Sequence, residues 1–198
     1  MGEQSSFPIP NSSFPVSRAI ISPMRAFLGI PLDDALRPGV KAVQDDLRGS
    51  GAAVSWVAPD SLHLTLKFLG DVPDSATFDL RPPAPFDLEL AGVGEFSGRV
   101  VWAGCRGALD PLRDLAGRAE TAAERRGVPR EKRPFSPHVT IGRIRSTRNL
   151  GGLRVAMARW KEHHFGPWPV RRVVLFRSES SPSGTVYKVV AEYPCNDS

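Results

Sequence analysis

Cysteine, histidine and long apolar runs are all scarce in this sequence of 198 residues. Its two cysteines, Cys105 and Cys195, form no CxxC pair, which excludes a disulfide-rich scaffold and a cysteine-based zinc site. Because no uninterrupted apolar stretch reaches the length that spans a bilayer, we do not expect an integral membrane protein. There are four histidines, few enough to examine one at a time.

A strong excess of one charge is also lacking, since the net charge is +5. The isoelectric point near 9.7 nevertheless favours an anionic partner. The basic residues are concentrated in one segment, 125–148, which carries eight of them against the single acid Glu131. Most of that segment is expected to be a solvated basic face, and part of it could attract an anionic partner.

The first 23 residues are rich in Ser, Pro and Asn and show neither helical nor strand periodicity. They also lack the basic start and apolar core of a secretory signal. We therefore predict a flexible leader over 1–23 and one folded domain over 24–198, in the cytoplasm by default. That length allows a single core or two small lobes.

The rest of the sequence alternates between strand-like and helix-like stretches. Apolar residues recur at helical spacing over 36–47, 109–123 and 150–160. Strands are predicted at 25–30, 53–57, 62–69, 86–90, 99–103, 138–144, 170–177 and 185–193. The Pro-rich segment 72–85 indicates a loop. This mixture favours an α+β fold with antiparallel sheets.

One short pattern occurs twice, as His63-Leu64-Thr65-Leu66 and as His138-Val139-Thr140-Ile141. Side chains alternate between the two faces of a strand, so the His and the Thr of each copy share one face. Two such strands facing each other would line a cleft with two imidazoles and two hydroxyls.

That set of groups suits phosphodiester hydrolysis. One histidine can take a proton from water and the other can protonate the leaving oxygen, because imidazole titrates near neutral pH. The threonine hydroxyls can donate hydrogen bonds to the phosphate oxygens. A single histidine in a strand is more often structural. The repetition of the pattern favours a functional pair.

The segments SLHLTLKFLG and RPFSPHVTIGRI resemble the two signature motifs of the 2H phosphoesterase superfamily. MRAFLGIPL, VVWAG and VVLFRSESSPSGTVYKVVAEYP extend the resemblance to its RNA 2′,3′-cyclic phosphodiesterase branch, also called 2′-5′ RNA ligase or LigT-like. The resemblance implies a bilobal α+β fold, with two antiparallel sheets facing a central cleft and helices outside.

The same resemblance implies the roles of individual residues. His63 would donate a proton to the leaving 3′ oxygen, His138 would accept one from water, and Thr65 and Thr140 would bind the phosphate. The substrate would be an RNA or oligonucleotide with a 2′,3′-cyclic phosphate, and the product a 2′-phosphomonoester. We expect a monomer that needs neither metal nor cofactor.

Two further residues are possible RNA or phosphate contacts. Arg133 lies in the RPFSPH block beside His138, and Lys67 follows Thr65 by two residues and so shares its predicted face. Lys67 could equally reach solvent. Arg143 and Phe68 are predicted on the opposite faces of their strands, and Phe68 in the core. Four other aromatic residues could stack on a base or belong to the core, namely Trp56, Trp102, Phe176 and Tyr187.

The sequence departs from its relatives between the first motif and the strand at 86–90. Relatives usually carry a helix there, whereas 71–85 holds four prolines, so we expect the helix to be missing or reduced. Three functions stay open: the cyclic phosphodiesterase, a 2′-5′ RNA ligase or 2′-5′ oligonucleotide phosphodiesterase with the same site, and a non-catalytic module that binds RNA ends.

Overall fold

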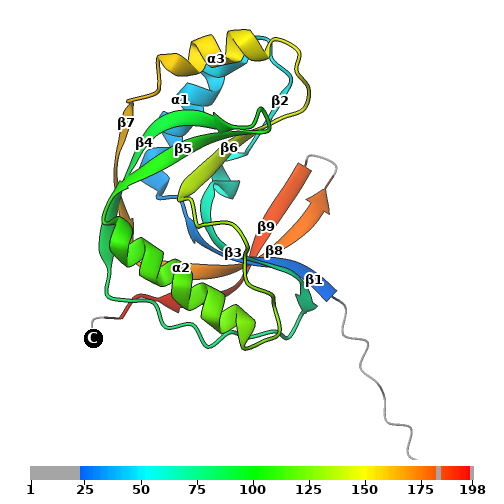
Figure 1. Cartoon of the computed structure of the whole chain (residues 1–198), viewed down its shortest axis with the longest axis vertical. Helices are drawn as coiled ribbons and strands as arrows, with labels where there is room; N and C mark the ends of the chain where they lie inside the picture. Colours follow the sequence, from blue (N-terminus) through cyan, green and yellow to red (C-terminus); the bar gives the residue numbers. More distant parts are fainter. Residues whose placement is uncertain (1–22, 182–183, 197–198) are drawn as a thin grey trace, which may run out of the picture.

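A long antiparallel sheet curls around the centre of the molecule, and the helices lie on its outer side (Figure 1). The computed structural model describes residues 23–181 and 184–196. No helix in these two ranges is long and apolar enough to cross a membrane.

The elements follow one another in the order that the sequence predicts, with one addition. The strands are β1 (Pro23–Pro31), β2 (Val54–Trp56), β3 (His63–Pro73), β4 (Phe86–Phe96), β5 (Val100–Gly107), β6 (His138–Ile144), β7 (His164–Val170), β8 (Arg172–Ser181) and β9 (Gly184–Pro194). The α-helices are α1 (Arg37–Arg48), α2 (Leu109–Glu124) and α3 (Leu150–Ala158). Two short 3₁₀ turns cover Asp34–Leu36 and Pro59–Ser61.

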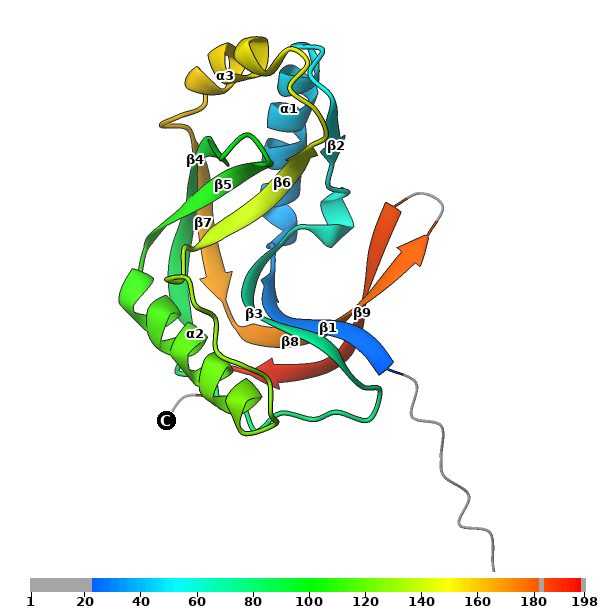
Figure 2. The ribbon, with the colours of Figure 1, turned by 45° about the vertical axis from the view of Figure 1, so that its right-hand side comes forward.

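The sheet consists of two halves that meet at the two motif strands. The strand order is β7-β4-β5-β6-β3-β1-β8-β9, with β2 paired to β6. We call β3, β1, β8, β9 and α2 the His63 half, and β6, β5, β4, β7, β2, α1 and α3 the His138 half. They join through one residue pair between β3 and β6, Leu64 with Val139, and Figure 2 shows the sheet bending there.

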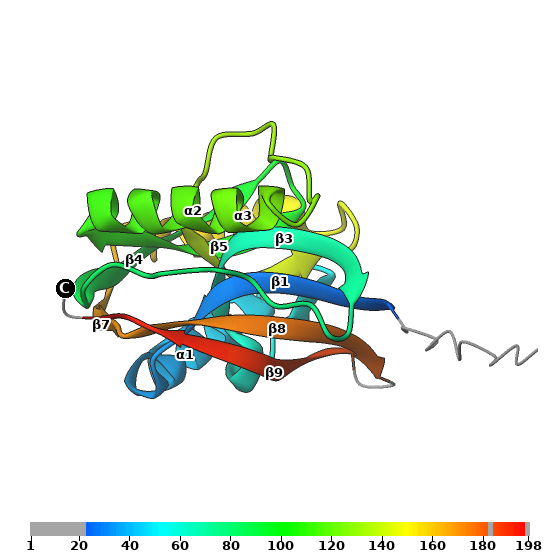
Figure 3. The ribbon, with the colours of Figure 1, turned by 90° about the horizontal axis from the view of Figure 1, so that it is seen from below.

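The helices cover the outer faces of the two halves. On α1, Val40, Val43 and Leu47 are fully buried, as the helical spacing predicts, and this helix packs on β6 and α3. α2 packs instead against β3, on the other half (Figure 3). One continuous apolar core runs beneath both halves.

The predicted fold class is confirmed, since the chain is α+β with antiparallel strands and helices outside. The two predicted sheets are continuous with each other through the Leu64–Val139 pair. No helix occupies 74–85, as expected, and this segment packs on the core through buried side chains that include Ala76, Phe78 and Leu80. Residues 1–22 of the predicted leader lie outside the described residues, so the division at Met24 stays a prediction.

Strand β7 is the element that periodicity does not predict. Its sequence, HFGPWPV, contains two prolines, which argue against an ordinary strand. β7 lies at the edge of the sheet and pairs with β4 alone, so its prolines need no second hydrogen-bonding neighbour. The prolines are therefore tolerated, and Trp168 between them is buried in the core.

Gly29 allows β1 to approach the first motif strand. A Cβ atom at this position would lie 2.8 Å from the carbonyl oxygen of Leu64. We predict that Gly29→Ala lowers the free energy of unfolding by about 1–3 kcal/mol, because the backbone of β3 would have to shift. Denaturant titration measures this.

Gly151→Ala is the matched control. Gly151 is exposed on α3 and a Cβ there would meet nothing within 4 Å. The free energy of unfolding of this variant should therefore rise by about 0.5–1 kcal/mol. Equal stability of the two variants would contradict the close approach at Gly29.

Candidate active site

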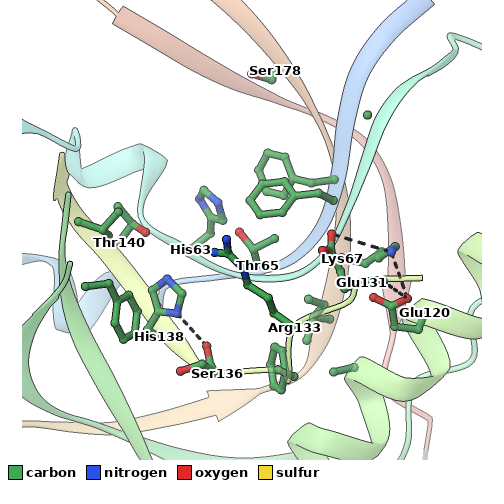
Figure 4. A pocket seen from close by; sticks show the side chains of 18 of the residues that line it. His63, Thr65, Lys67, Glu120, Glu131, Arg133, Ser136, His138, Thr140 and Ser178 are labelled. Carbon is green, nitrogen blue, oxygen red and sulfur yellow. Dashed lines mark hydrogen bonds and ion pairs between the residues drawn. The ribbon is translucent and has the colours of Figure 1, made fainter. Parts of the chain in front are cut away.

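The two copies of the His-x-Thr pattern lie side by side at the centre of the curled sheet. Each begins a strand, β3 at His63 and β6 at His138. Because β3 and β6 are antiparallel and Leu64 is paired with Val139, the register places each histidine next to the threonine of the other motif. Figure 4 shows all four side chains directed toward one shared space.

Both imidazoles are fixed in the same way. The Nδ1 atom of His63 lies 2.7 Å from the carbonyl oxygen of Ser61, and that of His138 lies 2.7 Å from the carbonyl oxygen of Ser136. A carbonyl only accepts, so each Nδ1 carries a proton and donates it. Each Nε2 is thereby left free to exchange a proton with a ligand. A serine two residues before each histidine thus extends the repeated pattern, although the role of its carbonyl is visible only in the fold.

The surroundings of the two histidines differ. The ring of His63 stacks on Phe27 at 4.5 Å between centroids and meets the edge of Tyr187 at 4.9 Å. Burial lowers the pKa of His63 from its ordinary value of 6.5 to about 4, and the charges of Arg143 and His138 act in the same direction. The hydrogen bond to Ser61 opposes this shift. His63 is therefore neutral at pH 7 in the free protein.

A β-bulge follows the threonine in each motif and reverses the alternation of side chains. In β3, the pairing with β1 skips Leu66, and in β6, the pairing with β5 skips Ile141. The residue five positions after each histidine therefore returns to the face of the cleft. In β3 this residue is Phe68 and in β6 it is Arg143, and both line the cleft.

The bulges correct three predictions. Phe68 is 57% exposed instead of belonging to the core. Arg143 lies on the face of Thr140, which strict alternation had excluded. Lys67 does not share the face of Thr65: it is 1% exposed and its ammonium is held by Glu120 and by the carbonyl of Pro129. Lys67 borders the cleft, but its ammonium is buried and paired, so it does not reach solvent.

The cleft is large and its wall is basic. Its volume is about 1410 Å³, and its lining includes six arginines, namely Arg25, Arg99, Arg113, Arg130, Arg133 and Arg143. Within the described residues, the guanidinium groups of Arg133 and Arg143 make no hydrogen bond and no ion pair. In Figure 4 the side chain of Arg133 extends toward the space between the histidines. Unpaired guanidinium groups in such a place can bind the oxygens of a phosphate.

The remaining candidates divide between the cleft and the rest of the molecule. Of the four aromatic residues, Tyr187 lines the cleft, whereas Trp56, Trp102 and Phe176 do not. Phe96, which the strand patterns do not single out, lines the cleft beside His138, with 5.1 Å between ring centroids. Its place at the end of β4 could not be foreseen from a strand predicted to stop at Leu90. Over residues 23–181 and 184–196 no group of three or more His, Cys, Asp or Glu side chains is placed to hold a metal ion.

Comparison with known proteins identifies the class of this fold and site. The model of the 2′-5′ RNA ligase superfamily matches residues 32–182, so the chain belongs to that superfamily. A relative from Methanothermobacter thermautotrophicus named RNA 2′,3′-cyclic phosphodiesterase is 34% identical over 83% of this chain and 95% of its own length.

Solved structures agree with the sequence relatives. LigT of E. coli in its apo form superposes with a TM-score of 0.71 at 27% identity, covering 89% of this chain and 99% of LigT. The complex of LigT with 3′-AMP superposes with a TM-score of 0.69 at 26% identity, covering 88% of this chain and 99% of LigT.

The environment of His63 predicts its titration. In the free protein, the His63 ring should stay neutral from pH 8 down to about pH 5 and gain its proton near pH 4, because burial disfavours the imidazolium. NMR of the imidazole signals measures this. Arg143→Gln should raise the pKa of His63, since one of the charges that lower it is removed. Titration of His63 near pH 6.5 in the unmodified free protein would contradict this environment.

Proposed function

We propose that this protein hydrolyses the 2′,3′-cyclic phosphodiester at the end of an RNA to a 2′-phosphomonoester, without a metal ion. The observation that carries the proposal is the pair of identically held imidazoles, His63 and His138, on adjoining strands of a basic cleft. The relatives named RNA 2′,3′-cyclic phosphodiesterase and the 3′-AMP complex of LigT support the substrate class.

In the proposed reaction, Nε2 of His138 takes a proton from water as its oxygen attacks phosphorus. The bond between phosphorus and the 3′ oxygen breaks, and Nε2 of His63 gives a proton to that oxygen. Water thereby adds one hydroxyl to phosphorus and one proton reaches the 3′ oxygen, so atoms and charge balance. The proton lost by His63 is regained when that of His138 is released through solvent.

As the proton donor, His63 must carry a proton on Nε2 when the reaction begins. In the free protein its low pKa leaves it neutral, which is the form that accepts a proton. A phosphate anion bound beside the ring favours the imidazolium and raises the pKa of His63, so substrate binding itself would favour protonation of His63. Thr65 and Thr140 would donate hydrogen bonds to the non-bridging oxygens, and Arg133 and Arg143 would balance their growing charge.

A single chain supplies every group of this cleft, which supports a monomer as the active form. Both cysteines are free thiols. Cysteines of proteins in a reducing compartment are usually free, so this supports action in the cytoplasm.

Removal of either imidazole should abolish most turnover. We predict that His63→Ala and His138→Ala each lower kcat at least about 10²-fold on a dinucleotide ending in a 2′,3′-cyclic phosphate, because each removes one proton transfer. His164→Gln, on the exposed edge strand β7, is the control and should retain full activity.

The same assay separates the alternatives. Activity should persist in EDTA, and the product should be the 2′-phosphate. Full activity of either alanine variant would overturn the assignment. Salt-sensitive binding of the dinucleotide without turnover would favour the module that binds RNA ends, and joining of 5′-hydroxyl RNA would favour the ligase.

A sulfur-substituted substrate assigns the two roles. When sulfur replaces the bridging 3′ oxygen, the leaving group no longer needs a proton. We therefore predict that His63→Ala regains most of its lost rate on this substrate, whereas His138→Ala does not. Stopped-time product analysis on both substrates measures the difference, and rescue of His138→Ala alone would reverse the assignment.

A further inference from the structure

Lys67 is a buried charged residue that the proposed reaction does not use. Together with Gln44 it makes up the buried polar and charged side chains of the part of the chain that the structure describes. An ammonium group removed from water is strongly unfavourable unless it is paired and hydrogen bonded. The groups that contact the Lys67 ammonium therefore show which elements of the fold this charge connects.

Three oxygen-bearing partners surround the ammonium. Nζ lies 3.0 Å from a carboxylate oxygen of Glu120 on α2, donates to the carbonyl of Pro129 at 2.7 Å, and lies 4.0 Å from Glu131. Figure 4 shows Lys67 directed toward these carboxylates, away from the two histidines. Lys67 thus joins β3 to α2 and to the connection 125–137 that follows α2.

This connection carries Arg133 to the cleft. Pro129 and Glu131 lie just before Arg133 in the sequence, and Arg133 itself has no hydrogen bond or ion pair among the described residues. The other polar contacts of residues 129–133 run to α2: Arg130 pairs with Glu124, and the backbone amide of Glu131 donates to Glu120. Lys67 is therefore the side chain that fixes this stretch against strand β3.

The bulge at Leu66 makes this contact possible. Without the skipped residue, Lys67 would face the cleft beside Thr65. With it, Lys67 pairs with Leu28 on the core side of the sheet and faces α2, while Thr65 keeps its place in the cleft. One irregularity thus separates the residue that would touch the phosphate from the residue that holds the connection.

We propose that Lys67 is a positioning residue that acts through Arg133: it anchors residues 129–131 on β3, so that the Arg133 guanidinium is held where a phosphate of the RNA enters. The inference rests on the proposed function, because it takes Arg133 as a phosphate contact. It assigns substrate binding, not proton transfer, to this buried ammonium.

Lys67→Met tests the role, since methionine keeps the apolar stem and removes the charge. We expect KM for a cyclic-phosphate RNA to rise about 10-fold with kcat within about twofold, because binding is lost and the histidines are untouched. Arg133→Ala should show the same pattern. The double variant should be no worse than Arg133→Ala alone, since Lys67 has nothing left to position.

A salt series adds a readout that a purely structural role would not move. The slope of log KM against log salt should fall by about 0.7 in each single variant, as one phosphate contact is lost, with no further fall in the double variant. Lys41→Met is the matched control: it also removes an ammonium paired to a carboxylate, but on the exposed surface of α1. It should leave KM and the slope unchanged.

The outcomes separate the two proposals. If the unmodified protein does not turn over the substrate, the proposed function fails. If it does, an unchanged KM in Lys67→Met overturns the positioning role. If Lys67→Met raises KM by the same factor in the presence and in the absence of Arg133, the positioning role is overturned as well, because such a rise indicates general destabilisation. If Lys67→Met does not fold, Glu120→Gln takes its place in the same cycle and is judged by the same criteria, with a smaller rise in KM expected.

Discussion

The contact on which the site depends is the backbone pairing of β3 with β6. It involves one residue pair, Leu64 with Val139, and both residues are fully buried. In each motif the paired residue lies between the histidine and the threonine, so a single register sets the relation among four functional side chains. Since a slip of either strand by one residue would turn its histidine and threonine to the other face, the buried aliphatic side chains of Leu64 and Val139 secure the site as much as they secure the core.

Charge is distributed over the molecule in a way that fits this site. Many arginines outside the cleft are paired with a carboxylate, such as Arg118 with Asp114 and Arg159 with Asp46. Arg133 and Arg143 instead line the cleft without a partner among the described residues. The net charge of +5 therefore says little about the site, where the guanidinium groups of Arg133 and Arg143 are free to meet a phosphate.

Much of this arrangement could be predicted from the sequence, because the helices, most strands and both motifs follow simple periodicity. The errors have two physical sources. The prolines of β7 are compatible with a strand only at a sheet edge, and edge position is a property of the assembled fold. The faces of Lys67, Phe68 and Arg143 depend on bulges set by neighbouring strands, so strict alternation placed all three wrongly. The face shared by each His and Thr was predictable because both precede the bulge.

The two halves of the sheet are not consecutive pieces of chain. β1 and β3 belong to the His63 half, yet α1 between them packs on the other half, and α2 returns to β3 after β5. The His138 half has all of its elements once β7 has been made, whereas the His63 half waits for β8 and β9. During synthesis, β1 must therefore remain without its outer neighbour until β8 has left the ribosome. The wall that carries Tyr187 closes the cleft last among the elements described, so a nascent chain acquires its substrate site only after β9 has been made.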